Sequence, residues 1–254
     1  MPDNLMEKTI LITGASGGIG SALARAYARD GVTLLLWGRD QVRLDEVAAQ
    51  CRARGATVTS EIFDLRDAAG FAAKLIAADA STPIDLAIFN AGLGGTAPKD
   101  AAAEAPETAQ AIAEVNFVAP VVGANVMADA MVRRGAGRIV LIGSISESYP
   151  LPMAPTYAAT KAGLRLFAEA LGLRLSKQGV TVTLVSPGFV DTPMSRKLTE
   201  PRPFLITADA AAAVIVRGVA AGKRVIVVPW QFAIIRAFSM ALPRAILRRV
   251  LSRA

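Results

Sequence analysis

Histidine is absent from the 254-residue sequence, and cysteine occurs only once, as Cys51. These two absences exclude a Ser-His-Asp triad, a histidine-ligated zinc site, an internal disulfide and a cysteine-rich metal site. We therefore expect no bound metal. Any general acid or base must be a tyrosine, a lysine, an aspartate or a glutamate.

A Pro/Gly/Ser-rich linker, a low-complexity tract and an internal repeat are also missing. Because 53% of the residues are hydrophobic, the chain can bury a large core, which favours one large α/β domain over two small ones. Residues 1–4 contain neither the basic nor the apolar segment of a signal peptide, so we expect a cytoplasmic protein.

Acidic residues are scarce in the C-terminal part of the chain. Residues 196–254 carry 11 Lys/Arg and 2 Asp/Glu, a net charge of +9. Residues 1–195 carry 17 Lys/Arg and 19 Asp/Glu, a net charge of −2, so the positive charge of the chain lies in its C-terminal part. No basic patch interleaved with aromatic residues is visible, so we expect no nucleic-acid partner. An anionic membrane surface or an acidic partner fits this charge distribution better.

Seven short apolar runs, rich in β-branched residues, have the pattern of buried strands. They cover residues 8–13, 32–37, 56–63, 84–89, 137–143, 180–185 and 224–228. Helical patterns lie between them, at residues 21–30, 41–54, 67–78, 108–134, 156–178 and 208–220. This alternation predicts an α/β fold with a doubly wound parallel sheet of about seven strands and helices on both faces.

The candidate functional residues come directly after the predicted strands. In a parallel sheet the ligand crevice lies beyond the carboxyl ends of the strands. The residues and segments at these ends are 14–20, Arg39, Asp64, Asn90, Ser144 and Pro187. Their common placement predicts a single ligand site at one edge of the sheet.

A glycine-rich turn, with Gly14, Gly18 and Gly20, joins the first predicted strand to the first helix. Glycine allows the backbone to turn sharply and approach a ligand closely, and the helix N-terminus offers free N–H groups to a pyrophosphate. Ser16 adds a hydroxyl. The spacing differs from the GxGxxG fingerprint, so a purely structural turn is the alternative.

Arg39 follows the second predicted strand, where dinucleotide-binding folds place an acid for a ribose 2′-hydroxyl or a base for a 2′-phosphate. The run Trp37-Gly38-Arg39 has no carboxylate before the arginine, and a guanidinium binds phosphate well. We expect NADP(H) to be preferred over NAD(H). Arg39 as a solvated side chain, followed by Asp40 as a helix cap, is the alternative.

Tyr157 and Lys161 lie four residues apart in a predicted helix, so both side chains are on one helix face. A phenol and an ammonium on one face can line the same site. The spacing is common by chance, and a half-buried tyrosine beside a solvated lysine is the alternative.

These motifs stand together in a fixed order. They are Thr13-Gly14-Ala-Ser-Gly-Gly18-Ile19-Gly20, Asn90-Ala91-Gly92, Asn116, Ser144, Tyr157-xxx-Lys161 and Pro187-Gly188. With this set the chain resembles the classical short-chain dehydrogenases/reductases, from about residue 8 to about residue 228. The resemblance implies a Rossmann-like fold and an oxidoreductase that binds a nicotinamide cofactor.

The resemblance also implies roles for four catalytic residues. Tyr157 would be the proton donor or acceptor, and Lys161 would bind the nicotinamide ribose and lower the tyrosine pKa. Ser144 would bind the substrate oxygen, and Asn116 would hold a water in a proton relay. Asn116 as a surface or kink residue is an alternative, and we interpret the neighbouring Ser146 and Ser148 as polar loop residues.

The cofactor contacts follow from the same resemblance. Asp64 and Leu65 would lie near the adenine, Asn90 and Gly92 would line the cofactor, and Thr192 would reach the carboxamide. The complete set is Gly14, Ser16, Gly18, Ile19, Gly20, Arg39, Asp64, Leu65, Asn90, Ala91, Gly92, Tyr157, Lys161, Pro187, Gly188, Val190 and Thr192.

This chemistry needs only a proton donor and an oxyanion partner from the protein, because the cofactor carries the hydride. Moving a tyrosine pKa from about 10 toward neutrality requires about 4 kcal/mol, part of which a nearby ammonium supplies. Two alternatives remain: a cofactor-binding sensor or scaffold without turnover, and a redox-neutral epimerase or dehydratase. The presence of all four catalytic residues favours the redox enzyme.

Beyond a domain at residues 1–229, with a substrate lid at about 188–206, lies a basic and apolar tail at residues 230–254. Ile246, Leu247, Val250 and Leu251 share one helical face opposite arginines. Pro243 and the arginines exclude an 18-residue apolar span. The tail packs on its domain, at a subunit interface or on an anionic membrane; a membrane contact would favour a lipid-like ketone or alcohol. By analogy with the family we expect a homodimer or homotetramer.

Overall fold

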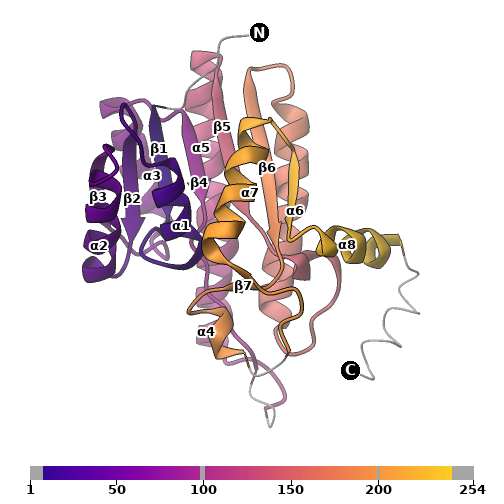
Figure 1. Cartoon of the computed structure of the whole chain (residues 1–254). Coiled ribbons are helices and arrows are strands. Elements are labelled where there is room, and N and C mark those ends of the chain that lie inside the picture. The colour runs from indigo at the N-terminus through magenta and orange to yellow at the C-terminus, as the bar shows by residue number, and fades with distance from the viewer. Residues whose placement is uncertain (1–7, 98–100, 199–200, 242–254) are drawn as a thin grey trace.

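The computed structural model describes residues 8–97, 101–198 and 201–241 of the chain. Within these residues seven strands form one parallel sheet, in the order β3-β2-β1-β4-β5-β6-β9 (Figure 1). The strands are β1 Thr9–Thr13, β2 Thr33–Gly38, β3 Thr57–Ile62, β4 Leu86–Phe89, β5 Gly137–Ile142, β6 Val180–Pro187 and β9 Val225–Val228. The predicted doubly wound sheet is confirmed.

Helices cover both faces of this sheet (Figure 1). Helices α1 Gly18–Tyr27, α2 Gln41–Arg52 and α7 Ala208–Ala220 share one buried cluster with it. On the other face lie α3 Ala68–Ser81, α5 Ala119–Arg134 and α6 Pro155–Arg174. The remaining helices are α4 Pro106–Ala113 and α8 Gln231–Ala241.

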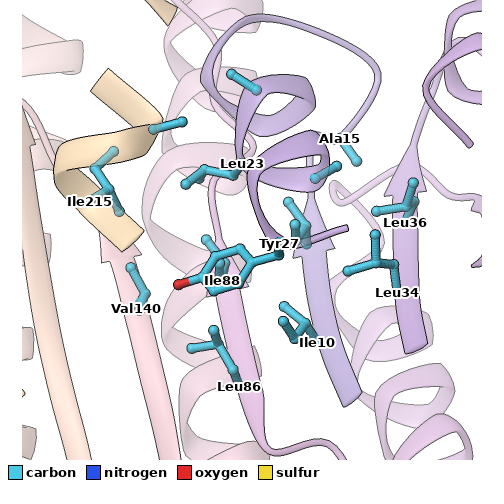
Figure 2. Packing of buried hydrophobic residues seen from close by; sticks show 14 of the residues in the cluster. Ile10, Ala15, Leu23, Tyr27, Leu34, Leu36, Leu86, Ile88, Val140 and Ile215 are labelled. Atoms are coloured by element: carbon cyan, nitrogen blue, oxygen red, sulfur yellow. The ribbon is translucent and has the colours of Figure 1, made fainter. Parts of the chain in front are cut away.

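The core forms because successive strand side chains point to opposite faces of a sheet that is covered on both sides. In β1, Ile10 and Ile12 pack toward α1 and α7, whereas Leu11 packs toward α3 and α5, and all three are fully buried. Figure 2 shows Tyr27 and Leu23 of α1 above strand residues of the first cluster. Because both faces of β1 are buried, its consecutive residues 10–12 are apolar and do not alternate with polar ones.

One predicted helix is divided in the structure. The segment predicted as a continuous helix at 108–134 consists of α4, a five-residue π-helical turn at Glu114–Val118 and α5. From Pro106 to Arg134 this is the one described helix that is long and apolar enough to cross a membrane, with a mean hydropathy of 1.5. Half of its most apolar window is buried inside the fold, so packing on the sheet accounts for its apolar character.

The lid region contains structure that the sequence pattern did not indicate. β6 continues to Pro187, and two short strands, β7 Val190–Asp191 and β8 Ile206–Thr207, pair in parallel at the base of the lid. α8 follows β9 and projects away from the body of the domain (Figure 1). The predicted amphipathic segment with Ile246, Leu247, Val250 and Leu251 lies outside the described residues.

Candidate active site

Two glycines in the turn between β1 and α1, Gly14 and Gly20, have no room for a side chain. Gly14 has a φ of +67°, and a Cβ there would lie 2.7 Å from the Cα of Ala91. A Cβ at Gly20 would lie 2.2 Å from the carbonyl oxygen of Gly14. Because α1 begins at Gly18 after Gly17, no side chain caps its first N–H groups. These groups fit a pyrophosphate, as the sequence predicted.

Asn90 joins the end of β4 to this turn through hydrogen bonds. Its side-chain amide donates to the carbonyl oxygens of Thr13, at 3.1 Å, and Gly14, at 3.2 Å. The backbone N–H groups of Asn90 and Ala91 donate to the Thr13 hydroxyl. Asn90 therefore shapes the turn with its side chain, which leaves the backbone of residues 90–92 to line a cofactor.

Arg39, Asp64 and Leu65, which were predicted to lie at the adenine end of the cofactor, follow β2 and β3. Arg66 binds the Asp64 carboxylate through its backbone N–H and its guanidinium, and these bonds hold the pKa of Asp64 below its usual range. Arg39 is exposed, and in the described part of the chain it makes neither a hydrogen bond nor an ion pair. Its guanidinium is therefore available to an anion.

Arg43 is a basic residue that the sequence analysis missed. It lies in the first turn of α2 and lines, together with Ser16 and Arg25, a hollow of about 240 Å³ beside the glycine turn. Asp40 caps α2 by accepting from the Arg43 backbone N–H at 3.1 Å, as predicted. The available signal was a second arginine four residues after Arg39, in the first turn of the helix that Asp40 caps.

Ser144 is the N-cap of a 3₁₀ turn, η2 Ile145–Ser148, directly after β5. Its Oγ accepts hydrogen bonds from the backbone N–H of Ser146, at 3.2 Å, and from the Ser146 hydroxyl, at 2.9 Å. Ser146 is buried, so it supports Ser144 and is not a solvated loop residue. Ser148 donates to the Ile145 carbonyl oxygen within the turn.

Lys161 is buried, with 4% of its surface exposed, so the alternative of a solvated lysine is wrong. Its Nζ donates to the carbonyl oxygen of Ile142 at 2.8 Å and lies 5.7 Å from the centroid of the Tyr157 ring. Burial lowers the pKa of Lys161 to about 8, while the Glu147 carboxylate opposes this effect.

The Tyr157 pKa differs from the expectation. Burial raises it above its usual value, the hydrogen bond with Ser144 lowers it, and Glu147 and Tyr149 raise it. The sequence-based expectation was that Lys161 lowers this pKa. Desolvation is the largest of these effects, so the Tyr157 pKa lies above its usual value.

Asn116 lies in the π-helical turn and is fully buried, so the surface alternative is wrong. Its amide donates to the Leu93 carbonyl oxygen at 2.8 Å and accepts from the Leu93 N–H at 2.7 Å. A Cβ at Gly92 would lie 3.4 Å from Asn116 Oδ1 and 3.8 Å from Lys161 Nζ. The structure thus brings Gly92, Asn116 and Lys161 together.

In the segment predicted as a lid, Thr192 lies against the glycine turn. The Thr192 methyl group would lie 3.2 Å from a Cβ at Gly18, and Thr192 is held by hydrogen bonds with Ser195. Val190 is buried, and Pro187 and Gly188 end β6 and follow it, respectively. The lid residues proposed to contact the cofactor therefore reach the turn that would bind its phosphates.

Known protein families and proteins of similar sequence agree with this geometry. The family model described as short chain dehydrogenase matches residues 8–203. An uncharacterized oxidoreductase of Myxococcus xanthus (strain DK1622) is 32% identical over 238 residues, which cover 93% of either chain. The chain therefore belongs to the short-chain dehydrogenase family, whose members are oxidoreductases acting on CH–OH/C=O groups.

Two solved structures are also similar. A short-chain dehydrogenase from Sphingobium yanoikuyae in complex with NADPH gives a TM-score of 0.80 at 30% identity and covers 91% of this chain and 92% of its own. A bulky-bulky ketone specific alcohol dehydrogenase from Comamonas testosteroni gives a TM-score of 0.77 at 27% identity, covering 94% and 96%. The first similarity, with the glycine turn, supports a nicotinamide cofactor.

Substituting Gly20 tests the turn as a cofactor cradle. Gly20→Ala is expected to weaken NADPH binding and lower the Tm, since its methyl group would lie 2.5 Å from Asn90 Nδ2 and overpacking costs ~1–3 kcal/mol. Gly17→Ala is the matched control, because a Cβ there meets nothing within 4 Å. Fluorescence titration with NADPH measures both affinities. Equal affinities for the two variants would contradict the assignment.

Proposed function

Because the chain belongs to the short-chain dehydrogenases, we propose that it is an NADP(H)-dependent enzyme that interconverts a carbonyl and a secondary alcohol. One observation carries this proposal: the buried ammonium of Lys161 lies 5.7 Å from the centroid of the Tyr157 ring, and the Ser144 side chain lies close enough to Tyr157 to lower the pKa of its hydroxyl. This arrangement supplies a proton and an oxyanion partner next to a glycine turn that fits the cofactor.

Tyr157 is the general acid in this proposal. The nicotinamide, when bound, supplies the hydride that reduces the carbonyl carbon. A raised pKa keeps the Tyr157 hydroxyl protonated at neutral pH, so it is ready to donate its proton to the carbonyl oxygen. In the reverse direction the same oxygen would accept the proton of the alcohol.

Ser144 acts as a donor because of how Ser146 holds it. Its Oγ accepts two hydrogen bonds from Ser146, so its own proton is left to point toward Tyr157 or a substrate oxygen. A neutral donor aimed at the developing negative charge stabilises the transition state. Ser146 therefore orients the reactive serine without contacting the substrate.

In this proposal Lys161 binds the cofactor and offsets the negative charge that develops on Tyr157. Below a pH of about 8 its Nζ is an ammonium, which binds ribose hydroxyls and faces the phenolate that remains after proton transfer. Asn116 keeps residues 92–93 in place through its bonds to Leu93 and would support a water beside Lys161. These two residues complete the proposed catalytic set.

The choice of NADP(H) over NAD(H) follows from the charges at the adenine end. Arg39 and Arg43 are cations near the end of β2, and two acids lie near them: Asp40, which caps α2 and pairs with Arg43 at 3.4 Å, and Asp64, which Arg66 binds. A 2′-phosphate fits two cations better than a 2′-hydroxyl does. The NADPH in the Sphingobium yanoikuyae neighbour is consistent with this choice.

An apolar, bulky and lipid-like carbonyl compound is the proposed substrate class. Four large apolar side chains are more than a third exposed in and near the lid: Met153, Met194, Phe204 and Leu205. Met194 lies against Gly94, where a Cβ would come within 3.1 Å of its Cγ. The Comamonas testosteroni neighbour is named for a bulky ketone, which supports the bulky part of this proposal.

The C-terminal helix supports a further part of the proposal, contact with the anionic cytoplasmic face of a membrane. Trp230, Ile234 and Phe238 are 67%, 63% and 66% exposed, and the C-terminal part of the chain is strongly basic. An exposed apolar helix face in a part of the chain that is rich in arginine suits an anionic bilayer. By family analogy the protein is a homodimer or homotetramer, and Leu166 and Leu173, exposed on α6, suit a subunit contact.

Replacing Tyr157 tests the mechanism. Tyr157→Phe should lower kcat about a hundredfold or more and leave the NADPH Kd nearly unchanged, because only the proton donor is lost. Tyr149→Phe, which removes a neighbouring phenol, should keep kcat within a few-fold. The assay follows NADPH absorbance with steroids, sugars, acyl ketones and quinones.

Other outcomes of this screen favour the alternatives. NADPH binding without turnover of any carbonyl would indicate a sensor or scaffold, and product formed without NADPH consumption would indicate an epimerase or dehydratase. Full activity of Tyr157→Phe would contradict the proposed general acid.

Replacing Arg39 tests the cofactor preference. Arg39→Ala should raise the NADPH Kd about tenfold or more and change the NADH Kd little, because a charge-assisted bond to phosphate contributes ~1.5–3 kcal/mol. Arg29→Ala, an exposed arginine beyond the other end of α1, is the control. Equal losses for both cofactors in Arg39→Ala would argue against a 2′-phosphate contact.

Serine substitutions on α8 test the membrane contact. The triple variant Trp230→Ser/Ile234→Ser/Phe238→Ser should float less with phosphatidylglycerol vesicles, whereas Val42→Ser/Ile76→Ser, on exposed apolar residues elsewhere, should float like the wild type. Unchanged flotation of the triple variant would refute the contact. A change in oligomer mass by light scattering instead would assign this face to a second copy of the chain.

A further inference from the structure

Glu147 is a buried carboxylate that the proposed mechanism does not use. Its side chain has 0% exposure. Oε1 accepts a hydrogen bond from the Ser186 hydroxyl at 2.7 Å and from Arg236 Nε at 3.1 Å. Burial raises the pKa of Glu147, while these two partners act in the opposite direction. A charge removed from water in this way is retained only when it is well partnered.

The position of Glu147 connects it to the catalytic serine. It is the third residue of the 3₁₀ turn that Ser144 caps, and Oε2 accepts from the Ser144 backbone N–H at 3.5 Å. A Cβ at Gly143 would lie 2.7 Å from Oε2, so the carboxylate fills the space under the start of the turn. Movement of this carboxylate would therefore move Ser144.

The countercharge comes from a distant part of the chain. Arg236 lies in α8, 89 residues after Glu147, and its side chain is only 16% exposed. Loss of one partner of a desolvated pair leaves an uncompensated charge, which is costly. α8 is therefore held to the catalytic turn by a specific polar contact and not by apolar packing alone.

The same face of α8 also contacts the lid. Phe232, one helical turn before Arg236, is 4% exposed and packs edge-on against Phe189, at 6.0 Å, and Phe204, at 5.7 Å, between ring centroids. A Cβ at Gly188 would lie 2.2 Å from the Phe232 ring. Residues 232 and 236 are four apart, so a single helix face reaches both the lid and the catalytic turn.

We propose that Glu147 and Arg236 are positioning residues. Through them, α8 keeps the Ser144 turn in a fixed position relative to the substrate lid. This inference rests on the proposed function, because it assigns the pair a role in the same site. Neither residue touches the substrate or the cofactor; they act through Ser144 and through the charge that Glu147 presents to Lys161.

The electrostatic part concerns Lys161, its neighbours Tyr157 and Glu147, and the groups that face those neighbours. Tyr157 lies on its own helix, Glu147 on the 3₁₀ turn, Tyr149 just after that turn, and Arg236 reaches Glu147 from α8. The Glu147 carboxylate raises the pKa of Lys161, against the larger effect of burial. Removing this negative charge must therefore lower the pH at which Lys161 loses its proton.

The first test needs neither cofactor nor substrate. In protein labelled with ¹³C-lysine, the Lys161 Cε signal, assigned by its loss in Lys161→Arg, is titrated in the wild type and in Glu147→Gln. The midpoint is expected to fall in Glu147→Gln. Should that variant not fold, Glu147→Gln/Arg236→Gln, which removes both charges, carries the measurement. An unmoved midpoint would overturn the electrostatic role.

The second test separates positioning from stability. With NADPH and a ketone that the wild type reduces, Arg236→Gln should lower kcat about tenfold or more with little change in the KM for NADPH, because misplacing Ser144 affects the chemical step. Arg236→Lys should restore much of kcat. The matched control is Arg134→Gln, which breaks a 2.7 Å ion pair with Asp79 at 31% and 11% exposure. Equal losses of kcat in Arg236→Gln and Arg134→Gln would overturn the positioning role.

Failure of the two proposals is distinguishable. A wild type that reduces no carbonyl contradicts the proposed function, while the lysine titration still decides whether Glu147 acts on Lys161. An active wild type whose kcat is unchanged in Arg236→Gln contradicts the positioning role and leaves the proposed function standing.

Discussion

Six parallel strand pairings hold the sheet together and bring the carboxyl ends of β1, β4, β5 and β6 to a single edge. Everything of chemical interest in the chain depends on that constraint. The glycine turn, Asn90, Ser144 and the lid each follow a strand end, so they meet although long stretches of sequence separate them. The hydrogen bonds of Asn90 to Thr13 and Gly14 show how closely two of these ends are joined.

Desolvation decides the protonation states at this edge. Burial raises the pKa of Tyr157 and of Glu147 and lowers that of Lys161 to about 8, so each shift favours the neutral form. A protonated phenol suits a proton donor, and a lysine with a weakened hold on its proton remains charged near neutral pH. The hydrogen bond from Ser144 and the pair of Glu147 with Arg236 adjust these states.

The C-terminal helix links parts of the molecule that the sheet alone would leave independent. Its inner face carries Phe232 against the lid and Arg236 against the catalytic turn, and its outer face exposes Trp230, Ile234 and Phe238. α8 therefore has one face against the predicted lid and the Ser144 turn and the other face in solvent. The proposed membrane contact and the proposed positioning role therefore concern opposite faces of one element.

The sequence by itself determined the alternating strands and helices, the glycine turn and the order of Ser144, Tyr157 and Lys161, because these depend on local periodicity and on spacing along the chain. It did not indicate the π-helical turn at Asn116, whose amide is held by Leu93, 23 residues away. Nor did it indicate the Glu147–Arg236 pair or the raised pKa of Tyr157. These features arise from burial and from contacts between distant segments, which only the tertiary structure creates.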